Sequence, residues 1–350
     1  MNSATPGSAN ASPSSSQVLV LYGGTSSERE VSTQSGEAVL NALQTSTQKG
    51  LFHDSIESVF IQPDGLWLWK GVASSEEDCI SRLPKDCVVF NALHGGRGEG
   101  GDIQRALSKA GIKYTGSGPQ ASELCMDKNA ARESLSSAGL LCAEGLLLTH
   151  LPDDKSDLTK LLGQLQDLNT RGAGWFIKPN RGGSSAGVQK VDIISGLLPA
   201  IELVLASGDE ALVEAAIPGI ELSAGVCGPS DDELTAFTPV EIQPRSAGWF
   251  DVKEKYDDKN GATEHCPPKS VGAEVISALK NAALLAHRSS ACAGYSRTDF
   301  IYSAEGQLYV LEVNTLPGLT PRSLLPLEAA TDGVTFPELC LRILSYSQAR

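Results

Sequence analysis

The sequence predicts an α/β protein in which an open, mostly parallel sheet is followed by two α+β units. Two strand–turn–helix patterns near the N-terminus predict the first part. The apolar run 18–22 ends at Gly23-Gly24 and precedes a helical pattern over 28–43, and the apolar run 87–93 precedes a glycine turn and a helical pattern. Strands that alternate with helices form a covered parallel sheet, which binds ligands at the carboxyl ends of its strands.

The remaining chain predicts the two α+β units. With a third strand at 113–115, the first domain spans residues 17–122. A helix, a glycine-rich hairpin and another helix form the central unit, 123–215. Residues 216–350 contain more strands, a helix over 271–290 and two adjacent strands, 295–302 and 308–314. The first 16 residues are rich in Ser, Ala, Asn and Pro without a charged side chain, which predicts a disordered tail and no secretory signal.

Composition excludes several function classes. The 350 residues carry a net charge of −14, which repels a nucleic-acid backbone, so we expect no nucleic-acid partner. No apolar run reaches the length needed to cross a bilayer, so we expect no membrane partner. The eight cysteines are scattered and form no C-x-x-C pair, which predicts reduced thiols and a cytoplasmic location.

Four polar side chains stand on the two adjacent C-terminal strands. Side chains alternate between the faces of a strand, so Arg297 points the same way as Asp299, and Glu312 the same way as Asn314. If the strands pair, oxygen-bearing groups and a guanidinium converge on one patch. Magnesium prefers such ligands and fills its remaining positions with phosphate and water. A surface ion pair between Arg297 and Asp299 is the alternative, but it leaves Asn314 unexplained.

A second pattern predicts phosphate binding. An apolar strand over 175–177 delivers Lys178, and a loop of glycines and serines follows over 182–187. Glycines allow backbone N–H groups to approach an anion, and hydroxyls add donors. The lysine precedes the glycines, so the loop is not a Walker A motif.

Taken together, the motifs resemble those of the D-alanine–D-alanine ligases, members of the ATP-grasp superfamily. The resemblance extends over most of the chain and includes, in order, GGTSSEREVS (23–32), ALHGG…GEGGD (92–102), YTGSG (114–118), MDK (126–128), IKPNRGGSSAG (177–187), PGIELSAGV (218–226), EKY (254–256), RTDF (297–300) and LEVNTLPGLTPRSL (311–324).

The resemblance implies a fold and a reaction. An N-terminal preATP-grasp domain would hold the first D-alanine, and two ATP-grasp subdomains would sandwich ATP. The reaction would join two D-alanines through a D-alanyl phosphate and a tetrahedral intermediate, and would supply a peptidoglycan precursor. The resemblance also implies two magnesium ions (or manganese), a cytoplasmic enzyme and a homodimer.

Site residues are implied in the same way. Lys128, Lys178, Ser185, Glu214, Glu221 and Lys255 would bind ATP, and Asp299, Glu312 and Asn314 would hold the metal ions. Glu28 would bind the first ammonium group, with Ser184 and Tyr256 linked to it under a mobile loop. Arg297 and the Gly318 N–H would stabilise the oxyanion. His94 would lie near the first carboxylate, while Ser323 and Leu324 would hold the second.

Several alternatives remain at this stage. A D-alanyl–D-lactate ligase, or a ligase for another D-amino acid, has the same motifs, although Tyr256 favours the dipeptide because ester-forming relatives usually have histidine there. An ATP-binding module without catalysis is disfavoured by the intact Arg297 and metal set. A dinucleotide-binding oxidoreductase lacks the fingerprint glycines. Ala215 and Ala216 replace a lysine and an aromatic common in the adenine pocket, which predicts weaker ATP binding.

Overall fold

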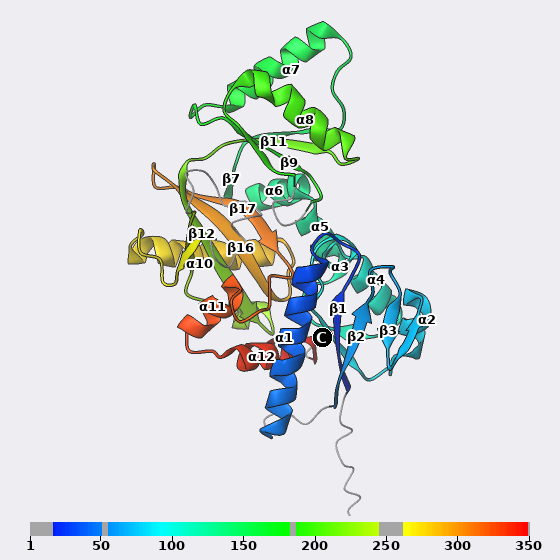
Figure 1. Cartoon of the computed structure of the whole chain (residues 1–350). Helices are drawn as coiled ribbons and strands as arrows, with labels where there is room; N and C mark the ends of the chain where they lie inside the picture. Colours follow the sequence, from blue (N-terminus) through cyan, green and yellow to red (C-terminus); the bar gives the residue numbers. More distant parts are fainter. Residues whose placement is uncertain (1–16, 51–54, 183–186, 245–261, 349–350) are drawn as a thin grey trace, which may run out of the picture.

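Three sheets form the framework of the protein (Figure 1). The computed structural model describes residues 17–50, 55–182, 187–244 and 262–348. Apart from one short strand of the large sheet that precedes the small sheet, the N-terminal sheet, the small sheet that carries α7 and α8, and the large C-terminal sheet follow one another along the chain. The predicted tail, residues 1–16, lies outside the described residues.

The N-terminal sheet has the strand order β4-β3-β2-β1-β5-β6. Strands β1, β5 and β6 are parallel, as predicted. The sequence analysis did not predict β2, which is also parallel, or β3 and β4, which add an antiparallel edge. The strands are β1 (Gln17–Gly23), β2 (Ser55–Ile61), β3 (Trp67–Trp69), β4 (Val72–Ser74), β5 (Val88–Asn91) and β6 (Lys113–Tyr114). The helices are α1 (Arg29–Gln48), α2 (Glu76–Arg82), α3 (Gly96–Glu99), α4 (Asp102–Lys109) and α5 (Pro119–Met126).

The central sheet is antiparallel, in the order β10-β9-β11-β8. Its strands are β8 (Gly145–Leu148), β9 (Trp175–Pro179), β10 (Gln189–Val191) and β11 (Ala211–Ala215). Two helices, α7 (Lys155–Leu168) and α8 (Leu197–Ala206), bury Leu165, Ile201 and Val204 against it. The short 3-10 turn Ile194–Gly196 leads into α8.

The third sheet has the order β15-β14-β12-β16-β17-β7, with β13 paired to β12. Its strands are β7 (Leu141–Cys142), β12 (Gly219–Gly228), β13 (Thr235–Ala236), β14 (Val240–Gln243), β15 (Thr263–His265), β16 (Gly294–Ser303) and β17 (Leu308–Asn314). The helices are α6 (Lys128–Ser137), α10 (Ala273–Ser289), α11 (Leu324–Thr331) and α12 (Phe336–Gln348), and Asp231–Glu233 forms a 3-10 turn. The predicted boundary at residue 123 assigns β7 to the central unit, yet β7 pairs with β17.

The two faces of the third sheet differ in chemistry because residues alternate along β12 and β16. Leu222, Ala224 and Phe300 face the apolar layer under α10. The opposite face carries polar groups around Ser223 and Asp299, and its further end is covered by α11 and α12 in a core shared with β1 and α1. Among the described residues, no helix has the length and apolar character needed to span a membrane.

Candidate nucleotide and amino-acid site

A cavity of about 560 Å³ lies between the central and third sheets. This volume suits a ligand the size of a nucleotide. The predicted nucleotide and metal residues on its wall come from α6, β9, β11, β12, β16 and β17, and they are Lys128, Lys178, Glu214, Glu221, Asp299 and Glu312. Segments far apart in the sequence therefore meet at one site.

Two lysines contribute positive charge to this cavity, Lys178 from β9 of the central sheet and Lys128 from the start of α6. Lys178 Nζ lies 2.6 Å from Glu214 Oε2, and the two side chains are only 12% and 11% exposed. Lys128 Nζ donates to the Gly182 carbonyl, and burial lowers the pKa of Lys128. At both ammonium groups, phosphate oxygens could take the place of the present partner, which is the Glu214 carboxylate for Lys178 and the Gly182 carbonyl for Lys128.

The hinge segment after β11 also lines the cavity. Ala215 and Ala216 stand on its wall, and their N–H groups donate to the Glu144 and Gly174 carbonyls at 2.9 and 3.0 Å. Neither alanine brings a charged or aromatic side chain to the cavity, which is the basis of the predicted weaker ATP binding.

The third sheet fixes a guanidinium opposite these lysines. As predicted, β16 and β17 pair, with Arg297 opposite Asn314 and Asp299 opposite Glu312. Arg297 makes two parallel hydrogen bonds to Asp299, from Nε to Oδ1 at 2.9 Å and from Nη2 to Oδ2 at 2.8 Å. Burial lowers the pKa of Arg297, but the adjacent carboxylate of Asp299 raises it by more, so the pKa lies above its ordinary value. The arginine is therefore permanently charged and held in one orientation.

The oxygen donors beside Arg297 fit a hard cation such as magnesium in chemical type. Asp299 and Glu312 offer carboxylates, and Asn314 an amide oxygen, since its Nδ2 donates to Asp299 Oδ2 at 3.1 Å. Asp299 Oδ1 also accepts from Ser223 Oγ at 2.5 Å, so binding of a metal ion at Asp299 requires exchange of an existing hydrogen bond. Among the described residues, no group of three or more His, Cys, Asp or Glu gathers as a metal site.

Two glycine-containing loops of the N-terminal sheet carry Glu28 and His94. Glu28 caps α1, and its Oε2 lies so close to Gly95 that a Cβ there would come within 2.3 Å. Gly95 also has φ +64, so only glycine suits this position. Ser26 Oγ donates to the His94 carbonyl at 2.8 Å and joins the two loops. Glu28 therefore stands at the carboxyl ends of β1 and β5.

His94 is buried and fully hydrogen-bonded. Its Nδ1 lies 2.9 Å from the Leu316 carbonyl, which can only accept, so Nδ1 carries the proton and Nε2 accepts from Ser35 Oγ at 2.9 Å. Ser35 Oγ in turn accepts from Leu319 N at 3.2 Å. Burial lowers the pKa of His94 to about 4, so the ring is neutral. In this geometry His94 orients the loop over residues 316–319, whereas the predicted contact with a substrate carboxylate stays untested.

One carboxyl group in this region was missed by the sequence analysis. Glu99, at the end of α3, is half-buried and accepts from Gly95 N through Oε2 at 3.0 Å. Burial, with the nearby charge of Glu28, raises the pKa of Glu99 to about 7. Glu99 lies in the GEGGD segment, but no residue spacing distinguished it from a surface acid.

The predicted second-substrate residues lie at the start of α11. Ser323 is its N-cap residue, and Leu324 is its first residue. Ser323 Oγ accepts from Thr320 N at 3.1 Å, and a Cβ on Gly318 would come within 2.7 Å of that oxygen. Gly318 thus packs directly on the helix start. The remaining predicted residues, Ser184, Ser185, Lys255 and Tyr256, lie outside the described residues.

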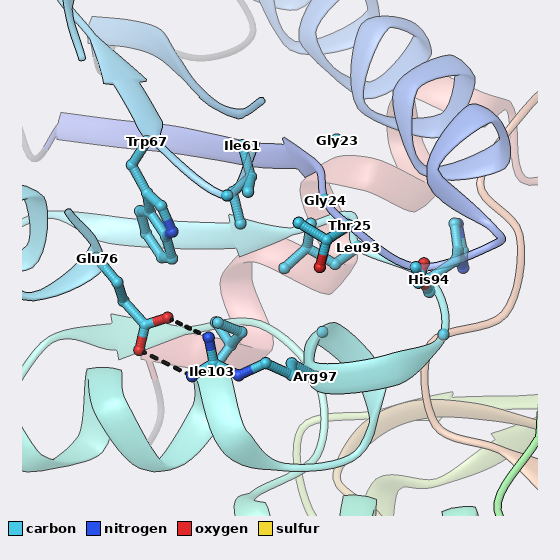
Figure 2. A pocket seen from close by; sticks show the side chains of 14 residues that line it. Gly23, Gly24, Thr25, Ile61, Trp67, Glu76, Leu93, His94, Arg97 and Ile103 are labelled. Carbon is cyan, nitrogen blue, oxygen red and sulfur yellow. Dashed lines mark hydrogen bonds and ion pairs between the residues drawn. The ribbon is translucent and has the colours of Figure 1, made fainter. Parts of the chain in front are cut away.

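Behind the N-terminal loops lies a smaller cavity of about 50 Å³ (Figure 2). Gly24, Thr25 and Leu93 lie on one side of it, and the Glu76–Arg97 ion pair lies near its lower edge in this view, with a distance of 3.0 Å. Trp67, only 2% exposed, contributes an apolar wall. The loops that present Glu28 and His94 are therefore supported from behind by packed side chains.

Two protein-family models match the chain. The model described as "D-ala D-ala ligase C-terminus" matches residues 150–345, and "D-ala D-ala ligase N-terminus" matches residues 17–86. The chain belongs to the D-alanine–D-alanine ligase family. Together these two models include strands of all three sheets, and the family fold is the ATP-grasp α/β fold that the sequence predicted.

Individual members of the D-alanine–D-alanine ligase family resemble the whole chain. The D-alanine–D-alanine ligase of Gluconobacter oxydans is 41% identical over 326 residues, which cover 93% of this chain and 96% of the relative. The crystal structure of the VanG D-Ala:D-Ser ligase from Enterococcus faecalis matches with a TM-score of 0.78, 29% identity and coverage of 95% and 99%. The Bacillus anthracis D-alanine–D-alanine ligase complexed with ATP matches with a TM-score of 0.74, 27% identity and coverage of 95% and 97%.

Proposed function

We propose that the protein joins two D-alanine molecules into D-alanyl-D-alanine at the expense of ATP, as a step in peptidoglycan precursor synthesis. One observation supports this most directly. Lys128 and Lys178 of the central unit line one nucleotide-sized cavity together with Asp299 and Glu312 of the third sheet. Glu312 and Glu28 both lie near enough to Glu99 to raise its pKa, which connects this cavity with the loop bearing Glu28. The family membership agrees with this assignment.

In the first step, a D-alanine carboxylate oxygen attacks the γ-phosphorus of ATP, and ADP leaves. A D-alanyl phosphate results. Such a transfer depends on positioning and on cations that absorb charge, more than on a protein nucleophile. Lys128 and Lys178 are placed to neutralise phosphate oxygens, while Glu28 is placed to hold the ammonium group of the first D-alanine. Both assignments are proposals that rest on position and residue type.

In the second step, the amine of the other D-alanine attacks the acyl phosphate carbonyl, and phosphate leaves the tetrahedral intermediate. Its oxyanion needs donors that are already oriented. Arg297 is such a donor, because two hydrogen bonds to Asp299 fix its plane. The Gly318 N–H would be the second donor. Ser323 and the N–H of Leu324, at the start of α11, would hold the second carboxylate.

The cofactor proposal is magnesium, with manganese as a substitute, at Asp299, Glu312 and Asn314. A bound divalent ion would neutralise phosphate charge during transfer. The support is the pairing that sets these oxygen-bearing side chains on one face beside the cavity. Glu312 and Asn314 offer the more accessible ligands, because Asp299 already accepts hydrogen bonds on both oxygens.

A phosphate-release screen tests the proposed function. The purified protein with ATP and magnesium is offered D- and L-amino acids and D-hydroxy acids, and mass spectrometry identifies the products. The expected result is phosphate release with D-alanine and a D-alanyl-D-alanine product. ATP hydrolysis independent of D-alanine would instead support an ATP-binding module without ligase activity.

A different acceptor in the second subsite is the alternative function. The VanG structure is titled a D-Ala:D-Ser ligase, and it matches over 95% of this chain. The same screen decides, since D-serine or D-lactate would then appear at the C-terminal position of the product. Tyr256 favours the dipeptide, because a neutral phenol does not repel the ammonium form of an amino-acid acceptor.

Location and assembly are also proposals. All eight cysteines are free thiols, and ATP is a co-substrate, which support a cytoplasmic enzyme. A homodimer is proposed from the family resemblance, and sedimentation equilibrium with the intact chain would test it.

A further inference from the structure

Glu328 is a fully buried acid on α11, 0% exposed, that no part of the reaction described above uses. It follows Leu324 by four positions, which is about one helical turn. Its Oε2 accepts from Gly225 N at 2.6 Å, and its Oε1 has no hydrogen-bond partner among the described residues. Burial of a carboxyl group with an unsatisfied oxygen costs folding free energy, so its presence here requires an explanation.

The strand beneath explains how the acid fits. β12 pairs with β14 over 221–223 and with β13 over 226–227, so the edge of the ladder is interrupted around Gly225. Glu328 satisfies the strand N–H in this gap. A Cβ at Gly225 would come within 2.4 Å of Glu328 Oε2 and within 2.3 Å of Leu325 Cδ1, so only glycine lets α11 approach this closely.

The contact point lies directly beside the oxyanion donor. Gly225 is the partner of Arg297 in the β12–β16 ladder, so the missing side chain of Gly225 and the side chain of Arg297 share one face. Directly paired positions have Cβ atoms about 5 Å apart. One carboxyl group therefore connects the strand of Arg297 with the helix whose first turn contains Ser323 and Leu324.

We propose that Glu328 is a positioning residue for the second amino acid, which sets the start of α11 at a fixed distance from Arg297 by accepting from Gly225 N–H. This inference rests on the proposed function. The acceptor, not the negative charge, performs this role. Burial raises the pKa of Glu328 to about 8, so a largely neutral acid at neutral pH agrees with it.

The experiment separates the two half-reactions. Hydroxylamine captures the D-alanyl phosphate as a hydroxamate and has no carboxylate, so its capture does not need Ser323 or Leu324. Dipeptide formation needs both. Glu328→Ala and the better-filling Glu328→Met remove the acceptor, whereas Glu328→Gln keeps an oxygen for Gly225 N–H. For Glu328→Ala and Glu328→Met we expect KM for the second D-alanine to rise about tenfold, the effect typical of the loss of one buried hydrogen bond.

Hydroxamate formation by Glu328→Ala and Glu328→Met should stay close to that of the wild type, and Glu328→Gln should restore dipeptide formation. Thr331→Ala, an exposed change one turn further along α11, is the matched control. Unchanged dipeptide kinetics in Glu328→Ala and Glu328→Met overturn the inference. An equal loss of both half-reactions, or failure of Glu328→Gln to restore activity, overturns it as well. A wild type that forms hydroxamate but no dipeptide contradicts the proposed function instead.

Discussion

Two ion pairs on opposite sides of the main cavity are buried alike but connected differently. The side chains of Arg297 and Asp299 are 13% and 9% exposed, and those of Lys178 and Glu214 are 12% and 11% exposed. Arg297 makes two parallel bonds within one strand, and Ser223 and Asn314 add further bonds to Asp299. Lys178 reaches Glu214 on the neighbouring strand through a single 2.6 Å contact.

The comparison teaches that burial alone does not define a role. A planar guanidinium held at two points resists rotation, while an ammonium on a flexible stem can exchange one oxygen partner for another. A donor for a developing oxyanion must be oriented before the reaction. A phosphate ligand must be able to change partner when the nucleotide arrives. We therefore expect the arginine to act on turnover and the lysine to act on ATP binding.

The largest effect should follow Arg297→Lys, which keeps the charge but removes the two-point geometry. Turnover of D-alanyl-D-alanine formation should fall about 100-fold or more, as is typical when an oxyanion donor is lost. Steady-state kinetics with phosphate release measure it. A mild change confined to KM would mean that Arg297 binds ground state and transition state equally, and that the contrast between the pairs is wrong.

Glu312→Gln should have the next largest effect, because it removes a proposed metal ligand without changing shape. We expect the magnesium concentration for half-maximal activity to rise about tenfold or more, in line with changes around metal sites. A magnesium titration of activity measures it, with circular dichroism as the test of folding. Near wild-type activity in low magnesium would remove Glu312 from the metal set.

Lys178→Met should raise KM for ATP about tenfold, as expected for loss of one charge-assisted hydrogen bond. Its effect on turnover should be smaller than that of Arg297→Lys. Lys190→Met is the matched control, because Lys190 lines the same cavity but pairs with the exposed Asp192. Equal losses of turnover in Lys178→Met and Arg297→Lys would break the proposed division between binding and catalysis.

A separate prediction concerns the pH dependence of stability and two titratable groups of the N-terminal loops, His94 and Glu99. The pKa of His94 is lowered from 6.5 to about 4, so its contribution to stability is complete above pH 6.5 and is lost as pH falls toward 4. The pKa of Glu99 is raised from 4.5 to about 7, so its contribution is complete below pH 4.5 and is lost as pH rises toward 7. In the pH range where both groups titrate, His94 makes stability rise with pH and Glu99 makes it fall.

Single substitutions should expose each slope. In Glu99→Gln, stability should increase with pH between 4 and 6.5, by up to about 3 kcal/mol from His94. In His94→Gln, stability should decrease between pH 4.5 and 7. Urea midpoints measured across this range test both. A parallel pH dependence in the two variants would show that these groups do not carry the opposing contributions.

The fold class and the paired strands β16 and β17 were predictable because alternation and strand–helix order are local signals. The meeting of Arg297, Asp299, Glu312 and Asn314 followed from strand geometry alone. The edge strands β3 and β4 were not predicted, since each has only three residues. The turn signal between β2 and β3, Pro63-Asp64-Gly65, could have indicated this hairpin.

The carboxyl groups that the structure adds to the site had no local signature. Glu99 ends a four-residue helix, and Glu328 sits in an apolar helix where it resembles an ordinary surface acid. What distinguishes each is the backbone N–H that it accepts from, which is the Gly95 N–H of the preceding turn for Glu99 and the Gly225 N–H of a distant strand for Glu328. The tautomer of His94 likewise depends on distant segments, because Ser35 belongs to α1 and the Leu316 carbonyl to the loop after β17.

The strand β7 has a mechanical consequence. Because β7 pairs with β17, the segment from β8 to β11 leaves the third sheet and returns to it as one continuous excursion, whose ends pair through Gly145 and Glu214. The segment from β8 to β11 can therefore open as one cooperative unit without disturbing the strand that bears Arg297. A nucleotide that contacts both the central sheet and the third sheet would stabilise the closed arrangement of this segment. Amide exchange in β9 and β11 should therefore slow when ATP is added, while exchange in β16 changes little.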